Sequence, residues 1–231
     1  MFITPRQSRD LRRTPRPAAA ALATVLLGLS VWTLPGCNIL GPALMAVTPD
    51  PSVAQQYALD PKRPTVIFID DRANRLPRRS LRTVMADQAQ TLLITEADHK
   101  NIIDAKAAFA AAAGERAGEP MTITEIGKAS KAEIVIYVTV DAFSLSPDGQ
   151  TYQPEAALRI KVIDAVADKR LWPTEPEGYK LAVSRVQSAQ FKPSTRSEAA
   201  KSQIDAAQYV GKAIAQVFYK HRVDESTSTG R

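Results

Sequence analysis

The chain has 231 residues, with 30 Lys and Arg against 24 Asp and Glu, and a single cysteine, Cys37. Residues 1–36 hold five basic residues and one acidic residue, so the other 195 residues hold 25 basic and 23 acidic ones, a net charge of +2. This balance excludes the strongly basic surface typical of nucleic-acid-binding proteins, and one cysteine excludes an internal disulfide bond.

The first 36 residues have the pattern of a secretory signal peptide. Residues 1–17 contain five arginines and one aspartate, and residues 18–34 contain no charge. A positive segment followed by an apolar one is typical of an export leader. The apolar run of 17 residues is at the short limit for crossing a bilayer, and no basic cluster follows it. We therefore expect a cleaved leader; the alternative is an anchor helix that contains an inert cysteine.

The end of this leader, Leu34-Pro35-Gly36-Cys37, resembles the lipobox of bacterial lipoproteins. The aliphatic residue and the small residue fit that pattern, whereas Pro35 departs from it. The resemblance implies cleavage after residue 36 and fatty chains, such as palmitate, on Cys37. Two or three chains hold a protein on a membrane almost permanently. Asn38 is not the aspartate that retains lipoproteins in the inner membrane of enteric bacteria, which favours the outer membrane.

Residues 37–64 are expected to form an extended tether between this lipid anchor and a folded domain. The segment Asn38–Pro64 contains five prolines and no sustained apolar period. The sequence "TVIFID", Thr65–Asp70, is a run of β-branched and aromatic residues and predicts a buried strand. We therefore expect the domain to begin at Thr65.

A helix is predicted from Pro77, which suits a first helical turn because its missing N–H is not needed there. Residues 91–114 then allow two interpretations. Either the helix continues, followed by a brief strand at Asn101–Ile103 and a second helix at Ala105–Ala113, or a strand precedes one alanine-rich helix; we favour the first. The apolar face of the first helix is predicted at one helical spacing: Leu81, Val84, Met85, Gln88 and Leu92.

The middle of the chain predicts a short helix and two strands. Thr122–Glu125, "TITE", has the pattern of a capping box and predicts a helix through Ala129. Ala132–Leu145 follows as a long central strand, because its first half is apolar without alternation. After the turn "SPDGQ", Ala156–Asp164 alternates apolar and basic residues, which is typical of a strand with one exposed face.

The last third predicts further strands and a long helix. A turn at Ala167–Lys169 leads through "RLWP" to "YKLAVSRV", which completes an antiparallel meander. Thr195–Glu198 forms a second capping box, and the helix that follows is expected to reach about His221. Its apolar stripe predicts packing on the sheet rather than a two-stranded coiled coil: Ala200, Ile204, Ala207, Gly211, Ile214 and Phe218, broadened by Val210 and Val217.

The order of elements predicts one α/β domain over residues 65–223, with a mixed sheet, an antiparallel meander and a long C-terminal helix, followed by a disordered tail, 224–231. This order resembles the domain of the TolB amino-terminal region, the curli-export lipoprotein CsgG and the penicillin-binding-protein activator LpoB. The resemblance implies a binding or assembly role rather than catalysis. The matching residues are Glu125-Ile126-Gly127, Tyr137-Val138, Ile163-Asp164-Ala165 and Trp172.

Residues with catalytic chemistry are sparse. His99 and His221 lack the spacing of metal ligands and are interpreted as solvated helix residues. No cysteine or serine motif for nucleophilic catalysis is present, so we expect no enzyme, no metal and no cofactor. The enzymatic alternative is a Mg²⁺-dependent hydrolase centred on Asp70, at the end of a buried strand. The adjacent Asp71 would point to the opposite face of an extended strand.

Five arginines follow this strand within eleven residues: Arg72, Arg75, Arg78, Arg79 and Arg82. Some of them approach the start of a helix, where the helix dipole disfavours positive charge. One interpretation is a solvated face partly neutralised by Asp70, Asp71 and Asp87. The functional interpretation is a site for a phosphate-bearing lipid, a glycan or an acidic protein, because guanidinium groups bind phosphate and carboxylate in a bidentate manner.

The sequence therefore predicts a lipoprotein anchored through Cys37 in a bacterial envelope, at the outer membrane and facing the periplasm. It would dock another envelope protein through a sheet edge or the arginine-rich loop, without binding nucleic acid. The alternatives are the hydrolase centred on Asp70 and a subunit of a homo-oligomeric export assembly. The sequence specifies neither the partner nor the oligomeric state.

Overall fold

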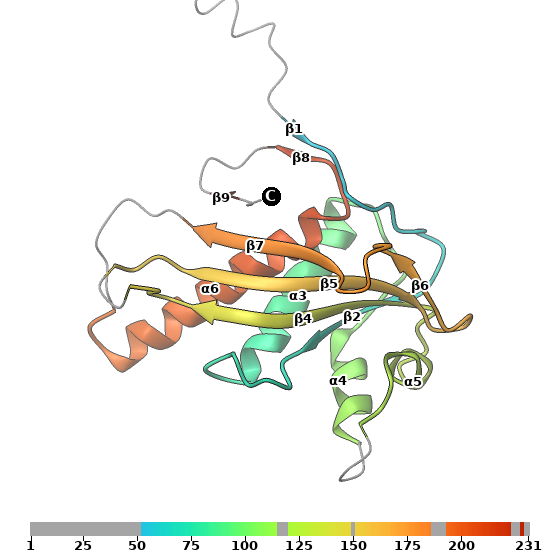
Figure 1. The fold of residues 1–231 in the computed structure, drawn as a ribbon, viewed down its shortest axis with the longest axis horizontal. Coiled ribbons are helices and arrows are strands. Elements are labelled where there is room, and N and C mark those ends of the chain that lie inside the picture. The colour runs from blue at the N-terminus through green and yellow to red at the C-terminus, as the bar shows by residue number, and fades with distance from the viewer. Residues whose placement is uncertain (1–51, 115–119, 149–150, 186–192, 223–226, 229–231) are drawn as a thin grey trace, which may run out of the picture. The chain divides into compact units, whose positions relative to one another are not determined.

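The computed structural model describes residues 52–114, 120–148, 151–185, 193–222 and 227–228. These residues form a seven-stranded mixed sheet, with helices on both of its faces (Figure 1), and a second sheet of two short strands. The sheet order is β3 (Ile102–Ile103), β2 (Thr65–Asp70), β4 (Ile134–Ser144), β5 (Glu155–Asp164), β7 (Tyr179–Arg185) and β9 (Thr227–Ser228), and β6 (Lys169–Trp172) also pairs with β5. The helices are α3 (Ser80–Thr95), α4 (Ala105–Ala113), α5 (Ile123–Ala129) and α6 (Arg196–Gln216).

The sheet is parallel at one side and antiparallel at the other, as the predicted fold class requires. Strand β2 runs parallel to β3 and β4, whereas β5 runs antiparallel to both β4 and β7. The predicted meander is modified, because β6 and β7 pair with successive parts of the same edge of β5. The loop between them contains Pro173, Pro176 and Gly178, whose φ is +100°. Prolines cannot donate to a strand ladder, so the loop interrupts one long strand.

Two hydrophobic layers lie on the two faces of this sheet. Helices α3 and α6 cover the face that contains Ile67, Ile136 and Ile160, and α4 and α5 cover Val66 and Phe68 on the other. The alternation predicted for β5 is confirmed: Leu158, Ile160 and Val162 are buried under α3 and α6, and the residues between them are partly exposed. None of the described helices is long and apolar enough to cross a bilayer.

The folded part begins before Thr65, inside the segment expected to be a tether. Strand β1 (Ser52–Val53) pairs with β8 (His221–Arg222), and the Gln56 amide donates to the Val217 carbonyl at 2.8 Å. The Tyr57 ring lies 5.7 Å from the Trp172 ring. This aromatic contact buries apolar surface that an extended tether would leave in water. Residues 37–51 of the expected tether lie outside the described residues.

The order of elements over residues 91–114 follows the favoured interpretation, with α3 ending at Thr95, then β3 and then α4. The start of α3 was predicted three residues too early. Asp71 accepts hydrogen bonds from the backbone amides of Arg75 and Leu76, so this stretch is held as a loop. The residues of α3 that are fully buried are Leu81, Met85, Ala86, Ala89 and Leu93, so the core side of the helix is displaced from the predicted one.

The capping box of α6 is confirmed, but the helix ends at Gln216 rather than near His221. The chain leaves the helix there because His221 and Arg222 pair with β1. Ile204, predicted to face the core, is 38% exposed, whereas Ala207, Ile214 and Phe218 are buried. A Cβ atom on Gly211 would lie 2.4 Å from the Met85 carbonyl oxygen, so α3 and α6 pack closely only because that residue is glycine.

The tail expected to be disordered contains one described element. Thr227 and Ser228, as β9, pair with Arg185 and Ser184 at the edge of the sheet. The rest of residues 224–231 lies outside the described part of the chain, as does part of the predicted turn "SPDGQ".

Candidate functional site

The arginine-rich loop connects the end of β2 to the start of α3, and Asp71 fixes its shape. One carboxylate oxygen of Asp71 accepts from the Arg75 amide at 2.6 Å and the other from the Leu76 amide at 3.1 Å. Asn74, just before these two amides, has a φ of +51°, a conformation that asparagine tolerates better than most residues. Because Asp71 is buried, these bonds hold the loop against the domain.

The structure brings three of the five predicted arginines together. Arg72, Arg79 and Arg82 line a cavity of about 330 Å³ between the loop, α3 and α4, whereas Arg75 and Arg78 do not line it. The Arg78 guanidinium instead donates to the Ala200 carbonyl of α6 at 3.0 Å. Besides the arginines, the cavity is lined by Phe68, Asp70, Asp71, Asn74, Phe109, Ala112 and Ala113.

Of the three aspartates expected to neutralise this cluster in part, one forms an ion pair with one of its arginines. Arg72 Nε lies 3.5 Å from a carboxylate oxygen of Asp70, but within the described ranges no ion pair reaches Arg79 or Arg82. The Asp71 carboxylate is bonded to backbone amides, and Asp87 forms no ion pair with any described residue. Over residues 70–82, five arginines face two aspartates, which leaves a net charge of +3.

The side chain of Arg82 is held by stacking rather than by hydrogen bonds. Its guanidinium lies over the Phe109 ring, 5.3 Å from the ring centre, and Phe109 in turn packs against Phe68, with ring centres 5.7 Å apart. The Nε atom of Arg82 is buried and has no hydrogen-bond partner in the described part of the chain. A buried donor without a partner costs about 1–3 kcal/mol.

Asp70 is also engaged by protein donors. One of its carboxylate oxygens accepts from the Arg72 amide at 3.1 Å, and the other accepts from the Tyr137 hydroxyl. Burial, together with the bond to Asp70, raises the pKa of Tyr137 to about 12, so the phenol keeps its proton. Among the described residues, no three histidine, cysteine or acidic side chains are grouped in a way that could hold a metal ion.

The start of α3 adds to the positive character of the cavity. Arg79 is the N-cap residue; its side chain makes no capping hydrogen bond, and the first turn contains no acidic residue. The first amides of a helix carry partial positive charge, although here the Leu81 and Arg82 amides donate to the Arg78 and Arg79 carbonyls. Two of the arginines that line the cavity, Arg79 and Arg82, therefore lie at a helix end that offers no negative charge to offset theirs.

The interpretation of His99 as a solvated helix residue was wrong. His99 is 2% exposed and lies in the loop after α3, with Nε2 3.2 Å from the Thr65 hydroxyl. Burial lowers the pKa of His99. His221 is likewise not helical; it lies in β8 and is half-buried. No periodicity in the residues around His99 places it in the core, because its contacts are with distant segments.

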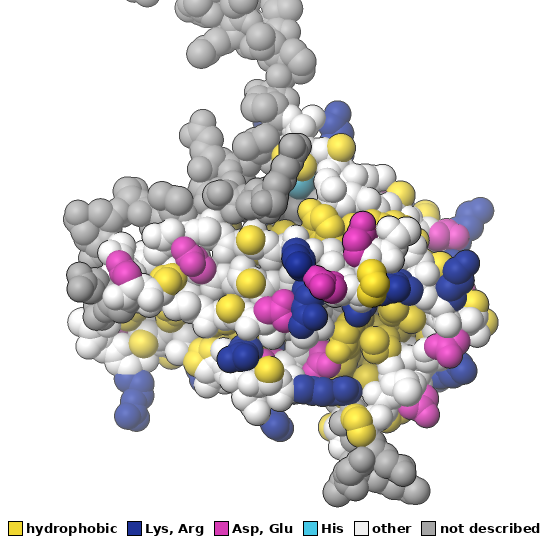
Figure 2. Space-filling view, viewed as in Figure 1, with side chains coloured by type: hydrophobic (Ala, Val, Ile, Leu, Met, Phe, Trp, Pro, Cys, Tyr) yellow, Lys and Arg dark blue, Asp and Glu magenta, His cyan; other side chains and the backbone are white. Residues whose placement is uncertain are grey.

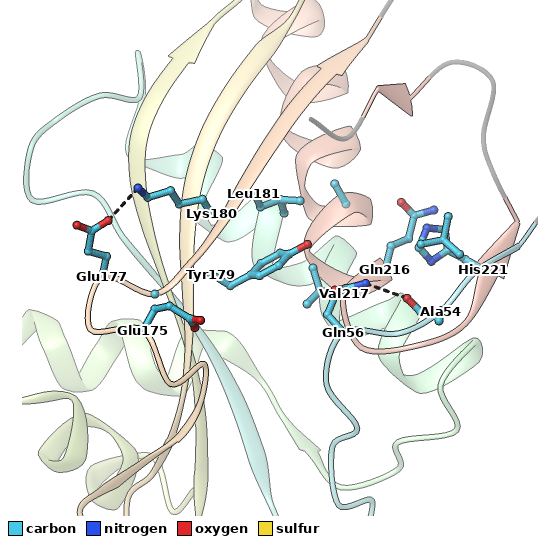
Figure 3. A pocket seen from close by; sticks show the side chains of 13 residues that line it. Ala54, Gln56, Glu175, Glu177, Tyr179, Lys180, Leu181, Gln216, Val217 and His221 are labelled. Atoms are coloured by element: carbon cyan, nitrogen blue, oxygen red, sulfur yellow. Dashed lines mark hydrogen bonds and ion pairs between the residues drawn. The ribbon is translucent and has the colours of Figure 1, made fainter. Parts of the chain in front are cut away.

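A second cavity, of about 680 Å³, lies between β7, the end of α6 and the β1–β8 pair, and the sequence did not reveal it. Figure 3 shows the Tyr179 ring pointing from β7 toward Val217, with Gln56 and His221 beyond it. Glu177 and Lys180 pair with each other at 2.8 Å. Four separate elements supply this lining, so no local pattern marks it, and it gathers no charge of one sign.

The face of the sheet that carries α4 and α5 is not fully covered by them, and its uncovered part has charged side chains of both signs. Figure 2 shows acidic and basic side chains intermixed on this side of the molecule. On it, the Arg159 guanidinium forms a bidentate pair with the Asp141 carboxylate, at 2.6 and 2.8 Å. Charges already paired in this way leave little attraction for a ligand, in contrast to the arginine-lined cavity.

Among the residues that carried the family resemblance, Gly127 and Asp164 serve packing and the shape of a loop. A Cβ atom on Gly127 would lie 2.5 Å from the Ala165 Cβ atom, so the glycine lets α5 approach the sheet. Asp164 accepts from the amides of Val166 and Ala167 and pairs with Arg63 at 2.9 Å. This arrangement lowers the pKa of Asp164, chiefly through Arg63. None of these side chains lines the arginine cavity.

Comparison with known proteins gives similarity to solved structures alone. No family model and no curated protein matches the chain. It is similar to the PelC dodecamer from Paraburkholderia phytofirmans, with 13% identity and a TM-score of 0.40 over 73% of this chain and 95% of that one. It is also similar to the hypothetical protein CT253 from Chlamydia trachomatis, with 14% identity and a TM-score of 0.38 over 67% and 93%. The lipoprotein GNA1162 from Neisseria meningitidis gives 11% and 0.36 over 62% and 96%.

These solved structures include a bacterial lipoprotein, but similarity at this level assigns no family. The likeness to the TolB amino-terminal region, CsgG and LpoB remains a prediction from the sequence.

Proposed function

We propose that this protein is a lipid-anchored accessory protein of a bacterial envelope, which binds another envelope component and catalyses no reaction. The observation that carries the proposal is the position of Cys37, directly after a charged segment, an apolar segment and Leu34-Pro35-Gly36. A thiol at the exit of an export leader is placed for lipid attachment. Cys37 lies outside the described residues, so this part of the proposal rests on the sequence.

The anchor would keep the domain close to the bilayer. Fourteen residues, 38–51, separate Cys37 from β1. A segment of that length spans at most about 50 Å when fully extended. Two or three acyl chains would retain the protein on the membrane almost permanently, and Asn38 supports the outer membrane as its location.

The binding role is supported by the arginine-lined cavity. Arg79 and Arg82 lack carboxylate partners among the residues described, and Asp71 holds the adjoining loop in one conformation. Guanidinium groups that have no carboxylate partner and are held in one arrangement bind an anionic group of a partner molecule favourably.

Mass spectrometry of the protein purified from its native membrane tests the anchor. We expect the first residue to be Cys37 and its peptide to be heavier than the unmodified one by the mass of a diacylglyceryl group and any further acyl chain. A Cys37→Ser variant should keep its leader and carry no lipid. A native protein that begins upstream of Cys37, or whose Cys37 has ordinary mass, contradicts the proposal.

Cross-linking in intact cells tests the binding role. The partners captured by the wild type are compared with those captured by a variant in which Arg72, Arg79 and Arg82 are changed to Gln, with Arg75→Gln as the matched control. We expect the triple variant to lose a partner that the control keeps. Identical partners in all three proteins would show that the cavity does not dock a partner.

The hydrolase alternative has one observation in its favour, namely that Asp70 and Asp71 both line the cavity. An assay of phosphate-ester hydrolysis with Mg²⁺, comparing the wild type with Asp70→Asn, separates the two functions. We expect no Asp70-dependent turnover, because both carboxylates already accept hydrogen bonds from the protein.

A further inference from the structure

We propose that the cavity formed by Arg72, Arg79 and Arg82 binds the phosphate group of a phosphate ester. This inference rests on the binding role proposed above and names the chemistry of the group that is bound. It concerns three of the five arginines, which the fold separates from Arg75 and Arg78.

The first argument is the convergence of the guanidinium groups. Arg79 and Arg82 are three residues apart at the start of α3, so their side chains lie on one face of the helix. Arg72 approaches from the loop, and its guanidinium also reaches the Met121 carbonyl at 3.4 Å. Arg72 and Arg79 are exposed, so the cavity is open to a ligand from the solvent.

The second argument is the orientation of Arg82. A guanidinium that stacks on an aromatic ring keeps its N–H groups free at its edge, in the plane where it binds phosphate oxygens. The Arg82 guanidinium lies over the Phe109 ring, and its buried Nε has no acceptor within the described part of the chain. A phosphate would therefore be bound through the terminal nitrogens of this guanidinium.

The third argument is the state of the two aspartates in the lining. Asp71 is bonded through both oxygens to loop amides, and Asp70 is bonded to Tyr137 and to the Arg72 amide. Neither lies within ion-pair distance of Arg79 or Arg82. The Asp70 carboxylate lies in the lining of the cavity, so it should lower the affinity for an anion and raise the affinity for a cation. A substitution of Asp70 therefore reports the sign of the charge on the ligand.

The size of the cavity suits a small group. At about 330 Å³ it lies at the low end of the range for ligand pockets, roughly 300–1,000 Å³. It therefore fits a phosphate and the atoms next to it rather than a whole lipid or an extended glycan.

The test uses the full-length mature protein in a neutral detergent. It is titrated with inorganic phosphate, with glycerol 3-phosphate and with mixed micelles that contain phosphatidic acid, and binding is followed by calorimetry and by the ³¹P chemical shift. Binding of all three probes at one site supports the shared phosphate chemistry. Preference for the micelles identifies a lipid headgroup as the source, and preference for glycerol 3-phosphate identifies a soluble ester.

Single substitutions locate the site. We expect Arg79→Gln and Arg82→Gln each to weaken binding by about 10-fold or more, as for the loss of one charge-assisted hydrogen bond. The control Arg75→Gln, on the same loop but not in the lining of the cavity, should change affinity by less than about 2-fold, since an exposed charge that does not contact the ligand is screened. Asp70→Asn should tighten binding, because it removes a negative charge that lies 3.5 Å from the Arg72 guanidinium.

Several outcomes overturn the proposal. They are the absence of binding to every phosphate probe, an equal loss in Arg75→Gln and Arg82→Gln, or weaker phosphate binding in Asp70→Asn. Circular dichroism melting of each variant shows whether a loss of binding reflects unfolding, and Asp70→Asn predicts a gain, which unfolding cannot produce. A negative result in these binding experiments does not change the mass measured for the Cys37 peptide. Failure of the phosphate proposal can therefore be distinguished from failure of the lipoprotein proposal.

Discussion

Helices α3 and α6 pack against each other on the same face of the sheet, but they begin in different ways. At the start of α6, the Thr195 hydroxyl accepts from the Glu198 amide at 3.1 Å, and the Glu198 carboxylate accepts from the Thr195 amide, also at 3.1 Å. At the start of α3, Arg79 makes no capping bond and no acidic residue follows. The backbone at Thr195 is extended, whereas that at Arg79 is already helical, which is unsuited to a capping side chain.

The start of α6 is therefore stabilised by capping interactions, whereas the start of α3 is not. A capping residue is worth about 0.5–2 kcal/mol, and a favourable charge near a helix end adds about 0.3–1 kcal/mol. Helix α3 has neither contribution and places arginines where charge of that sign is unfavourable. The short helix α5 has a capping box of its own, with Thr122 and Glu125. The exception at α3 coincides with the arginine-lined cavity, which agrees with the binding role proposed above, since binding sites often cost stability.

The largest expected effect lies where the two helices touch. Gly211→Ala places a Cβ atom 2.4 Å from the Met85 carbonyl oxygen and 2.8 Å from the Gln88 Cβ atom. We expect the free energy of unfolding to fall by about 1–3 kcal/mol or more, because overpacking outweighs the better helix propensity of alanine. Urea denaturation measures the change, with Gln208→Ala, on the exposed side of α6, as the control. Equal stability of the two variants would contradict the close packing.

Removing the cap of α6 should make its start resemble that of α3. Thr195→Ala leaves the Glu198 amide without its hydroxyl acceptor, and we expect a loss of about 1 kcal/mol in the free energy of unfolding. Thr195→Ser retains the acceptor and should remain within about 0.5 kcal/mol of the wild type. The comparison fails if the alanine and serine variants unfold at the same urea concentration.

Removing charge at the start of α3 should have the opposite sign. Arg79→Gln relieves repulsion with the helix dipole and the neighbouring arginines, so we expect a gain of about 0.3–1 kcal/mol at low salt. The gain should shrink in 1 M NaCl, where the Debye length is about 3 Å. The same substitution should weaken phosphate binding, so stability and affinity move in opposite directions. A variant that loses both would indicate that Arg79 has a structural role instead.

The smallest expected effect is a pH dependence of the free energy of unfolding. It arises from the capping carboxylate of α6, which has no counterpart at the start of α3. Hydrogen bonds from Ser194 and Thr195 lower the pKa of Glu198 below its ordinary value of 4.5. A carboxyl whose pKa is lower in the folded state stabilises the fold above its unfolded pKa and loses that contribution as the pH falls through the lower folded value. Glu198→Gln keeps an acceptor for the cap but cannot titrate.

Unfolding by urea between pH 6 and pH 3 measures this effect. Wild type and Glu198→Gln should differ by a constant amount above about pH 4.5, and the difference should change below it, since the other acids are common to both. Parallel curves over the whole range would show that the capping carboxylate does not titrate differently on folding.

The sequence was most informative where short-range interactions decide the structure. The capping boxes at Thr122 and Thr195 were identified because each needs only residues one turn apart. The strands β2, β4, β5 and β7 were identified from apolar runs or alternation, which follow from the alternating direction of side chains along a strand. The arginine-rich loop was also identified, because its five arginines are close together in the sequence. Their arrangement in space was not.

The errors occur where side-chain contacts or distant segments, rather than periodicity, decide the outcome. The end of α6 depends on pairing of His221 with Val53, and the burial of His99 depends on its contact with Thr65. The start of α3 depends on how the Asp71 side chain folds back onto its own loop. Such contacts are made in the folded chain alone, so no periodicity in the sequence marks them.

By itself, the sequence determined the export pattern that ends at Cys37, the α/β order of elements and the presence of an arginine-rich loop. Tertiary structure alone decided which arginines lie together. It turned Arg78 toward α6, placed Arg72, Arg79 and Arg82 around one cavity, and supplied Phe109 from a different helix. The physical reason is that a binding site needs charges and surfaces to converge in space, and convergence is set by packing between elements rather than by neighbours in the chain.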